Sequence, residues 1–218
     1  MKLRSKKFHG IEVDFDDEDI KEALIGQFNL DDLYLYKDIE DRKLYLTGEI
    51  EVWSVLDAVR KILQYNADDK GIPIEERKPI LLYITSEGGV VDAGTELIDV
   101  ILASKTPVYT INLGYWYSMG LLIGLAGHKR IGSKNSKILL HDGSNFTYGS
   151  STKVQDQMEF AKRVDQRNKE YVISRTKVTA KEYAKNARVE WYMFADEAKE
   201  RGFIDCILGE DCDLDDVI

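Results

Sequence analysis

The sequence has few of the residues that mark several common classes of protein. Its 218 residues include two cysteines, three prolines and three histidines. Two cysteines cannot build the disulfide framework of a small secreted domain, and the spacing of Cys206 and Cys212 matches no metal-binding motif. We therefore expect reduced thiols and a cytoplasmic protein. No metal ion and no organic cofactor is implied.

Positive charge and long apolar runs are also in short supply. Asp and Glu number 39 against 30 Lys and Arg, so the net charge is −9. A general nucleic-acid-binding protein needs a basic face to displace counterions, so that class is excluded. No apolar run approaches the roughly 20 residues that span a bilayer. The basic residues 1–7 are not followed by the apolar core of a signal peptide. The sequence therefore predicts neither a nucleic-acid partner nor a membrane partner.

The chain does contain enough apolar residues for one sizeable core. Hydrophobic residues make up 44% of the sequence, and a chain of this length is typical of one domain. We divide it into an arm or cap over 1–40, a body over 41–209 and an acidic tail over 210–218. The arm could form a short helix over 18–28. We expect the tail to be frayed.

Strands and helices alternate along the body. Short apolar runs predict strands, and apolar residues at helical spacing predict helices. Their alternation predicts an α/β fold built from βαβ units with right-handed crossovers. The expected strands lie at 43–47, 80–85, 108–113, 137–141 and 203–208, and the expected helices at 52–66, 92–103, 118–126, 152–175 and 195–201.

Ser118 begins the most informative segment of the body. A β-rich apolar run and a turn precede it, and an apolar helix follows. A hydroxyl at this place can be a nucleophile, and the free N–H of Met119 at the helix start can stabilise an oxyanion. The glycines Gly88 and Gly89 follow strand 80–85 and let the backbone come close to a ligand, so the Gly89 N–H would be a second donor. The structural alternative for these glycines is a tight βα turn.

One of the three histidines is suitably placed to serve Ser118. His9 lies in the arm. His128 lies beyond the helix, and ten residues at 1.5 Å each put it about 15 Å from the serine. His141 ends a strand that returns toward the start of the helix, so it is the candidate base. The alternative is a strand-end histidine with a local partner.

Glu190 is the candidate for the group that orients His141. It lies among large apolar residues before a helix, which would partly desolvate its carboxylate, and pairing with Arg188 is the alternative. Asp142 points to the opposite strand face from His141, and Asp165 lies in a charged run of the long helix. The order serine, histidine, acid predicts acyl-transfer chemistry, with peptide hydrolysis as the leading case.

Five motifs resemble those of the Clp protease proteolytic subunit (ClpP) family of serine peptidases. They occur in the family's order and at similar spacing, over about residues 44–208. The resemblance implies a ClpP/crotonase-type α/β spiral of βαβ units. The five segments are 82–94 with Ser-Glu-Gly-Gly, 114–120 with Tyr-Ser-Met-Gly, 126–130 with Ala-Gly, 138–141 ending in His, and 194–205 with Glu-Ala and Gly-Phe-Ile-Asp.

The resemblance also implies a role for each matching residue. Ser118 would be the nucleophile, His141 the base and Glu190 the third member of the triad. Gly89 and Met119 would be the backbone donors of the oxyanion hole. Residues implied to contact the substrate are Gly88, Gly143, Ser144 and Tyr117.

The resemblance also implies an activity and an assembly. The chain would be a self-compartmentalising endopeptidase that acts on unfolded polypeptides. Its subunits would form heptameric rings that stack as a tetradecamer, joined by a long handle helix that matches residues 152–175. An AAA+ ATPase unfoldase would be a partner, although residues 1–40 lack the N-terminal loop pattern of the family.

Four departures separate the chain from the common family pattern and make it similar to divergent phage or mobile-element members. Glu190 replaces an aspartate, Glu87 replaces a proline, and Asp142-Gly143 replaces Gln-Pro. The aromatic run 115–117 replaces small residues and would reshape the substrate pocket. Glu190 and the aromatic run 115–117 motivate one alternative, a catalytically inactive ring-forming scaffold or regulatory subunit. A crotonase-type acyl-CoA enzyme is a weaker alternative, because such an enzyme would not need the serine–histidine pair.

Overall fold

The computed structural model describes residues 6–8, 11–13, 30–144 and 146–217. The chain divides into two compact units, Met1–Asp41 and Arg42–Ile218. In its described part, the first unit contains an antiparallel pair of strands, β1 (Lys6–Phe8) and β2 (Ile11–Val13), and the helix α2 (Leu30–Asp41). The helix considered over 18–28 lies outside the described residues.

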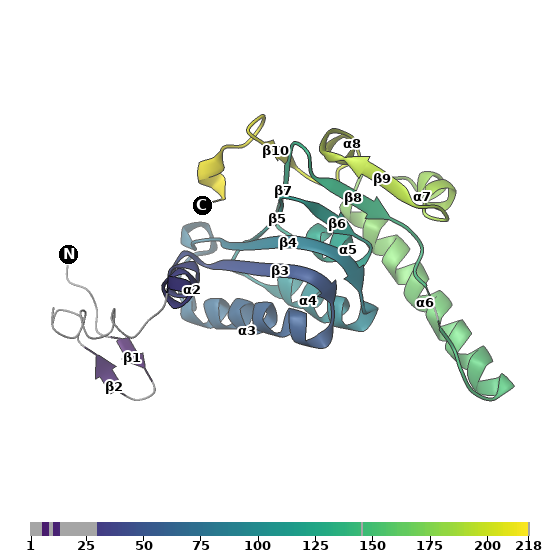
Figure 1. Cartoon of the computed structure of the whole chain (residues 1–218), viewed down its shortest axis with the longest axis horizontal. Coiled ribbons are helices and arrows are strands. Elements are labelled where there is room, and N and C mark those ends of the chain that lie inside the picture. The colour runs from purple at the N-terminus through teal and green to yellow at the C-terminus, as the bar shows by residue number, and fades with distance from the viewer. Residues whose placement is uncertain (1–5, 9–10, 14–29, 145, 218) are drawn as a thin grey trace. The chain divides into compact units, whose positions relative to one another are not determined.

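The second unit is built on an eight-stranded sheet with the order β10-β7-β5-β4-β6-β8-β9, in which β3 also pairs with β4 (Figure 1). Its pairs are parallel, apart from the antiparallel pair β8–β9. The parallel pairs confirm the α/β fold class. The strands are β3 (Lys43–Ile50), β4 (Ile80–Gly89), β5 (Val108–Asn112), β6 (Tyr115–Tyr117), β7 (Lys129–Ser133), β8 (Lys137–Leu140), β9 (Trp191–Phe194) and β10 (Cys206–Leu208).

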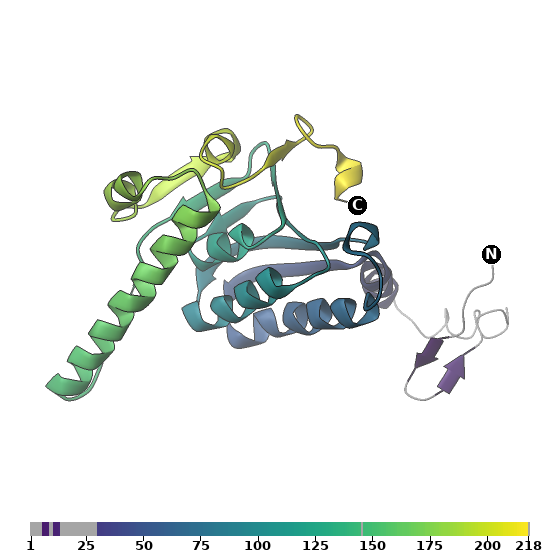
Figure 2. The same ribbon diagram turned by 180° about the vertical axis from the view of Figure 1, so that it is seen from behind.

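The helices of the second unit form where apolar residues recur at helical spacing. In α3 the residues Val55, Val59 and Ile62 share one face, and all three are buried. Helices α3 and α4 lie along one face of the sheet (Figure 2). The helices are α3 (Val52–Asp68), α4 (Val91–Ala103), α5 (Met119–Leu125), α6 (Ser151–Arg175), α7 (Ala180–Asn186) and α8 (Ala195–Glu200), with short 3₁₀ turns η1 (Ile74–Glu76) and η2 (Leu214–Asp216).

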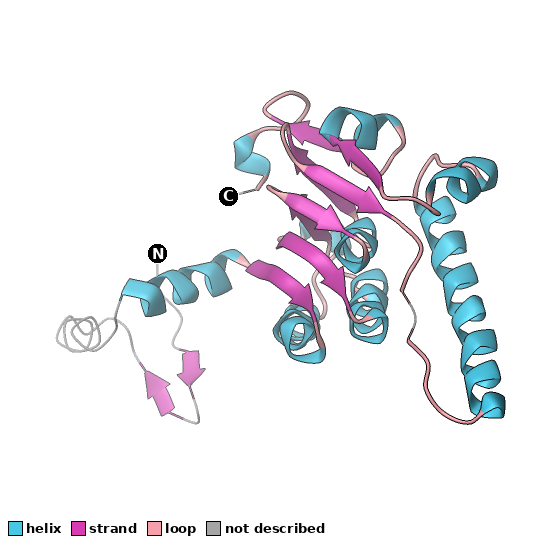
Figure 3. Ribbon diagram, turned by 45° about the vertical axis from the view of Figure 1, so that its right-hand side comes forward, coloured by secondary structure: helices cyan, strands magenta, loops and turns pink. Residues whose placement is uncertain are grey.

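Helix α6 extends well beyond the sheet (Figure 3). Of its 25 residues, Val172 is buried within the chain. Tyr171, in the last turns, donates its hydroxyl to the Leu122 carbonyl at 3.1 Å, so this end of the helix is fixed to α5. The other end projects away from the core.

Several short elements of the second unit, among them β9, differ from the sequence prediction. Strand β6 forms where we expected a turn, and its central residue Trp116 is fully buried. Strand β7 and helix α7 were likewise not predicted. Elements of three to seven residues carry too few periodic positions to show a pattern, and tertiary packing decides their conformation.

The C-terminal segment also corrects two expectations. The tail is not frayed: Val217 is buried, and its carbonyl accepts a hydrogen bond from the Tyr83 hydroxyl. The acidic residues of this segment suggested a solvated tail. Val217 and Cys212 instead pack in a small apolar cluster with residues of the sheet. The expectation of reduced thiols is also wrong, since Cys206 and Cys212 form a disulfide. Strand β10 and the turn after it place the two Cα atoms 6.1 Å apart, within the range that a disulfide requires.

Within the described ranges, no helix combines the length and the apolar character needed to cross a membrane. The cytoplasmic location stays a prediction.

Candidate active site

Ser118 occupies a strained turn between β6 and α5. Its backbone has φ +51°, one of two positive values among non-glycine residues in the described ranges. The Ser118 N–H donates to the Leu139 carbonyl at 3.0 Å, and the Ser118 carbonyl accepts from the N–H groups of Leu121 and Leu122. Such a conformation costs about 1–3 kcal/mol and persists only where the surroundings enforce it. A strained strand–turn–helix also presents the nucleophile of many hydrolases.

Close packing by glycines enforces this turn. A Cβ on Gly88 would lie 2.7 Å from the Ser118 Cβ and 3.0 Å from the Met119 nitrogen. On the helix side, a Cβ on Gly120 would lie 2.9 Å from the Ser86 Cβ. The start of α5 therefore packs closely against the end of β4. A larger residue at either glycine would displace Ser118.

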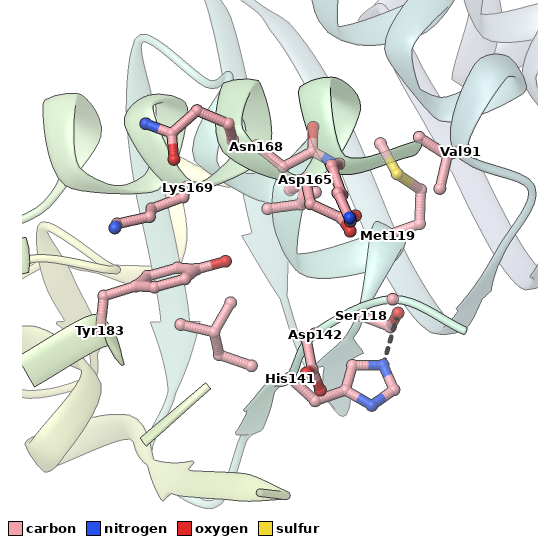
Figure 4. Close-up of a pocket in the computed structure, with 14 residues that line it drawn as sticks. Val91, Ser118, Met119, His141, Asp142, Asp165, Asn168, Lys169 and Tyr183 are labelled. Carbon is pink, nitrogen blue, oxygen red and sulfur yellow. Dashed lines mark hydrogen bonds between the residues drawn. The ribbon is translucent and has the colours of Figure 1, made fainter. Parts of the chain in front are cut away.

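His141 bridges Ser118 and Glu190. The His141 Nε2 lies 2.8 Å from the Ser118 Oγ, and the Nδ1 lies 3.2 Å from a carboxylate oxygen of Glu190. Figure 4 shows the hydrogen bond between the serine and the imidazole. With Nδ1 donating its proton to the carboxylate, Nε2 is left free to accept the hydroxyl proton of Ser118. This arrangement can perform general-base-assisted nucleophilic attack.

The sheet brings these three residues together from distant parts of the chain. Ser118 follows β6, His141 follows β8, and Glu190 precedes β9. Strand β6 pairs with β8 in parallel, so the carboxyl ends of both strands lie side by side. Strand β9 runs antiparallel to β8, so the residue before β9 lies beside the residue after β8. This register joins His141 and Glu190, which are 49 residues apart.

The other candidate groups have different positions. The Nδ1 of His128 accepts a hydrogen bond from the Val108 N–H at 3.1 Å, and burial lowers the pKa of this imidazole. His128 is therefore a residue whose ring has a structural contact with β5. His9 lies outside the described residues. In the described part of the chain, no group of three or more His, Cys, Asp or Glu side chains is placed to hold a metal ion.

The two proposed oxyanion donors flank the serine differently. Met119 is the first residue of α5, where backbone N–H groups lack intrahelical acceptors. Gly89 lies at the end of β4 with φ +148°, and its backbone packs so tightly on β3 that a Cβ would lie 2.4 Å from the Ile50 carbonyl oxygen. Gly88, between them, lies against Ser118, and its N–H donates to the Ser86 hydroxyl at 3.0 Å.

A cavity of about 260 Å³ opens beside Ser118 and His141 (Figure 4). Its size suits one side chain rather than a larger ligand. Gly143 contributes to the wall, whereas Ser144 and Tyr117 are not among the described residues that line it. The lining residues are Val91, Ser118, Met119, Leu122, Leu140, His141, Asp142, Gly143, Lys162, Asp165, Gln166, Asn168, Lys169 and Tyr183.

Most of the wall residues were missed as site residues by sequence reasoning, and two of the missed residues have shifted pKa values. Asp165 lies on the cavity side of α6, where partial burial and then the charge of Asp142 raise its pKa. Tyr183 comes from the unpredicted helix α7, and burial followed by the charges of both aspartates raises its pKa. The charged run around Asp165 resembles a solvated helix face, so no local signal identified this residue. The cavity wall therefore contains two carboxyl groups, Asp142 and Asp165, together with the amino groups of Lys162 and Lys169.

Comparison with known proteins places these features in context. The family model described as Clp protease matches residues 31–211. The chain is 30% identical over 184 residues to the ATP-dependent Clp protease proteolytic subunit 2 of Treponema pallidum (strain Nichols), covering 84% of this chain and 89% of that protein. It is also 30% identical over 178 residues to the protein of the same name from Treponema denticola, covering 81% and 86%.

Proposed function

The chain belongs to the Clp protease family, and from this premise we propose that it is a serine endopeptidase that cleaves unfolded polypeptides. The observation that carries the proposal is the unbroken contact from Ser118 through His141 to Glu190. The family match alone would leave the chemistry open. The geometry supports the proposal, because a hydroxyl, an imidazole and a carboxylate lie in hydrogen-bonding order.

The reaction would proceed through an acyl-enzyme. The Ser118 Oγ attacks the scissile carbonyl carbon while the His141 Nε2 accepts the hydroxyl proton. Glu190 stabilises the imidazolium that forms and holds its tautomer. The protonated His141 then gives its proton to the leaving amine, and the amide bond breaks. A water molecule attacks the ester by the same route, and this releases the second product and restores the Ser118 hydroxyl.

Backbone donors would stabilise the tetrahedral intermediate. We assign the Met119 and Gly89 N–H groups to this role, since they flank the nucleophile from α5 and β4. Losing one such donor typically costs about 2.7–4 kcal/mol of transition-state stabilisation. The substrate strand would pass Gly88, Gly143, Ser144 and Tyr117, and one substrate side chain would enter the cavity.

We also propose that the active form is a ring assembly that encloses the sites. The exposed part of α6 supports this proposal, because Met158 and Phe160 are 41% and 60% exposed in the single chain. Apolar side chains on a projecting helix suit contact with another copy. Two heptameric rings stacked as a tetradecamer are the arrangement we propose. An AAA+ ATPase unfoldase is the partner we propose, since both relatives are named ATP-dependent.

Labelling with a fluorophosphonate probe, combined with a native mass measurement, tests the chemistry and the assembly together. We expect one adduct per chain on Ser118 and an unchanged assembly. The variant Ser118→Ala should lose the adduct and keep the wild-type native mass. An assembled particle that neither labels nor cleaves a fluorogenic peptide would instead identify an inactive scaffold. Saturable binding of an acyl-CoA by calorimetry would identify a crotonase-type enzyme.

A further inference from the structure

The cavity beside the reacting groups has an apolar floor. Met119, Leu122 and Leu140 line it, and all three side chains are buried. Ser118 and His141 line the same cavity, so the substrate side chain nearest to it is that of the residue whose carbonyl is attacked. A volume of about 260 Å³ limits the size of this side chain but not its chemical type. The polar residues of the wall determine the type.

Two carboxyl groups lie at the rim of this cavity. Asp142 directly follows the base His141, and Asp165 comes from α6. Both aspartates are exposed to solvent, whereas the floor is buried. The Asp165 carboxylate lies over Gly143, since a Cβ on this glycine would be 3.9 Å from the Asp165 Oδ1. The two carboxyl groups are therefore close to the segment 141–143, which carries the base.

Neither Asp142 nor Asp165 forms an ion pair with any residue that the structure describes. Lys162 and Lys169 also line the cavity. Figure 4 shows Lys169 on the side of the cavity away from Ser118. Lys162 is exposed and lies about one turn nearer the projecting end of α6. Desolvation and then the charge of Asp142 raise the pKa of Asp165, which is opposite to the direction expected for a carboxylate paired with a lysine.

A lysine or arginine side chain suits such a cavity. Its methylene groups can lie on the apolar floor while its charged end stays at the solvated rim. At the rim the two carboxylates attract a cation and repel the carboxylate of a glutamate side chain. An apolar side chain of the same length gains the contact with the floor alone. The floor and the rim together therefore favour a basic side chain over an acidic or an apolar one.

We propose that the cavity binds a lysine or arginine side chain at the substrate residue that supplies the scissile carbonyl, and that Asp165 is the specificity-determining residue. This specificity rests on the proposed peptidase function. It gives a role to one departure from the family pattern, because Asp142-Gly143 replaces Gln-Pro and adds a carboxyl group to the wall. Asp165 is the residue to test, since Asp142 adjoins His141 and its substitution would also affect the base.

The test compares two peptidyl phosphonate probes that label Ser118 and differ in one side chain, which is lysine in one probe and norleucine in the other. Norleucine has the same carbon chain as lysine and lacks the amino group. The readout is the second-order rate of labelling, followed by intact mass. The wild type should react about tenfold faster with the lysine probe, as expected for a hydrogen bond between charged groups. In Asp165→Asn the lysine probe should react about tenfold more slowly, so the ratio of the two rates should fall towards one.

Asp156→Asn is the matched control, since Asp156 is an exposed aspartate on the same helix and is not among the described residues that line the cavity. It should keep the wild-type ratio. Equal rates of the two probes in the wild type, failure of the lysine probe to label, or an unchanged ratio in Asp165→Asn would overturn the specificity. A simple fluorophosphonate without an amino-acid side chain should still label the wild type in each of these cases. Absence of that labelling would overturn the proposed function as well, so the two failures are distinguishable.

Discussion

At the scale of single residues, the conformation of Ser118 depends on the absence of side chains around it. Gly88 has φ +101° and contacts the serine directly. Ser86 packs against Gly120, and the Met119 side chain packs against Gly94. A strained nucleophile is stable only if its neighbours leave no other conformation. The conformation of the serine therefore depends on the glycines that surround it.

The substitution Gly88→Ala tests whether the Ser118 conformation depends on this glycine. The new Cβ would lie 2.7 Å from the Ser118 Cβ, and the residue would keep a positive φ that alanine disfavours. We expect a loss of about 1–3 kcal/mol of unfolding free energy, measured by urea denaturation. We also expect labelling of Ser118 to slow by about 100-fold, because a displacement near 1 Å has that effect on a reacting group.

Gly48→Ala is the matched control for that substitution. Gly48 has φ +79° at the register shift in β3, and a Cβ there would meet nothing within 4 Å. The control should lose stability through backbone strain alone and label at the wild-type rate. Equal labelling by both variants would contradict the role assigned to Gly88.

At the scale of elements, a buried ion pair joins the end of α3 to the start of β3. Arg42 donates two hydrogen bonds to Asp69, at 2.6 and 2.7 Å, and the two side chains are 15% and 3% exposed. The Thr106 hydroxyl donates to the same carboxylate at 2.8 Å. These contacts hold the first strand of the second unit in its register on the sheet.

Asp69→Asn should destabilise the protein by about 3–5 kcal/mol at pH 7, because it leaves Arg42 buried without its counter-charge. The hydrogen bond from Arg42 and then that from Thr106 outweigh burial and lower the pKa of Asp69. Its contribution is therefore complete above the unfolded pKa of about 3.9 and is lost as the pH falls through the lower folded value. Urea unfolding as a function of pH should show a smaller acid dependence in the variant.

Glu182→Gln provides the comparison for this pair. Glu182 and Arg201 form an ion pair at 3.3 Å whose side chains are 34% and 31% exposed. Exposed pairs contribute about 0–1 kcal/mol, so this variant should remain near wild-type stability. Equal losses in the two variants would contradict the importance of burial at Asp69.

The elements also show what a sequence can predict. Helix α3 and strand β4 are long and strongly patterned, and both lie where periodicity places them. Strand β6 could not be predicted, because its burial depends on pairing with β4 and β8, which are distant in sequence. The buried C-terminal turn was missed for the same reason, since its charges suggest solvent and its contacts are with the sheet.

Some residues of the candidate site could be predicted from the sequence, and others could not. Ser118 and His141 follow from chain order and strand direction, and the structure places them in contact. Their catalytic roles remain proposals. Asp165 and Tyr183 reach the cavity only because α6 packs on α5 and α7 packs on α6, which no local pattern encodes. The edge-to-face contact between Tyr117 and Tyr192 depends on side-chain geometry across β8 and also lies beyond sequence reasoning.

At the scale of the whole molecule, the second unit has exposed apolar side chains that do not pack in its core. In and before α6, the exposed fractions are 93% for Phe146, 86% for Tyr148, 60% for Phe160 and 41% for Met158. Phe160 lies midway along the projecting helix, and the cation of Arg163 lies 5.8 Å from its ring centroid. A surface of this kind suits association between copies of the chain, as the proposed rings require.

Phe160→Glu should therefore weaken assembly without unfolding the chain. The substitution replaces a large apolar side chain with a charge that would lose its hydration in an interface between copies. We expect native mass spectrometry to show smaller species, and a thermal midpoint measured on the separated species close to that of dissociated wild type. Phe160→Leu keeps the apolar character and should keep the wild-type mass. A Phe160→Glu protein with the full native mass would place the contact between subunits on another surface.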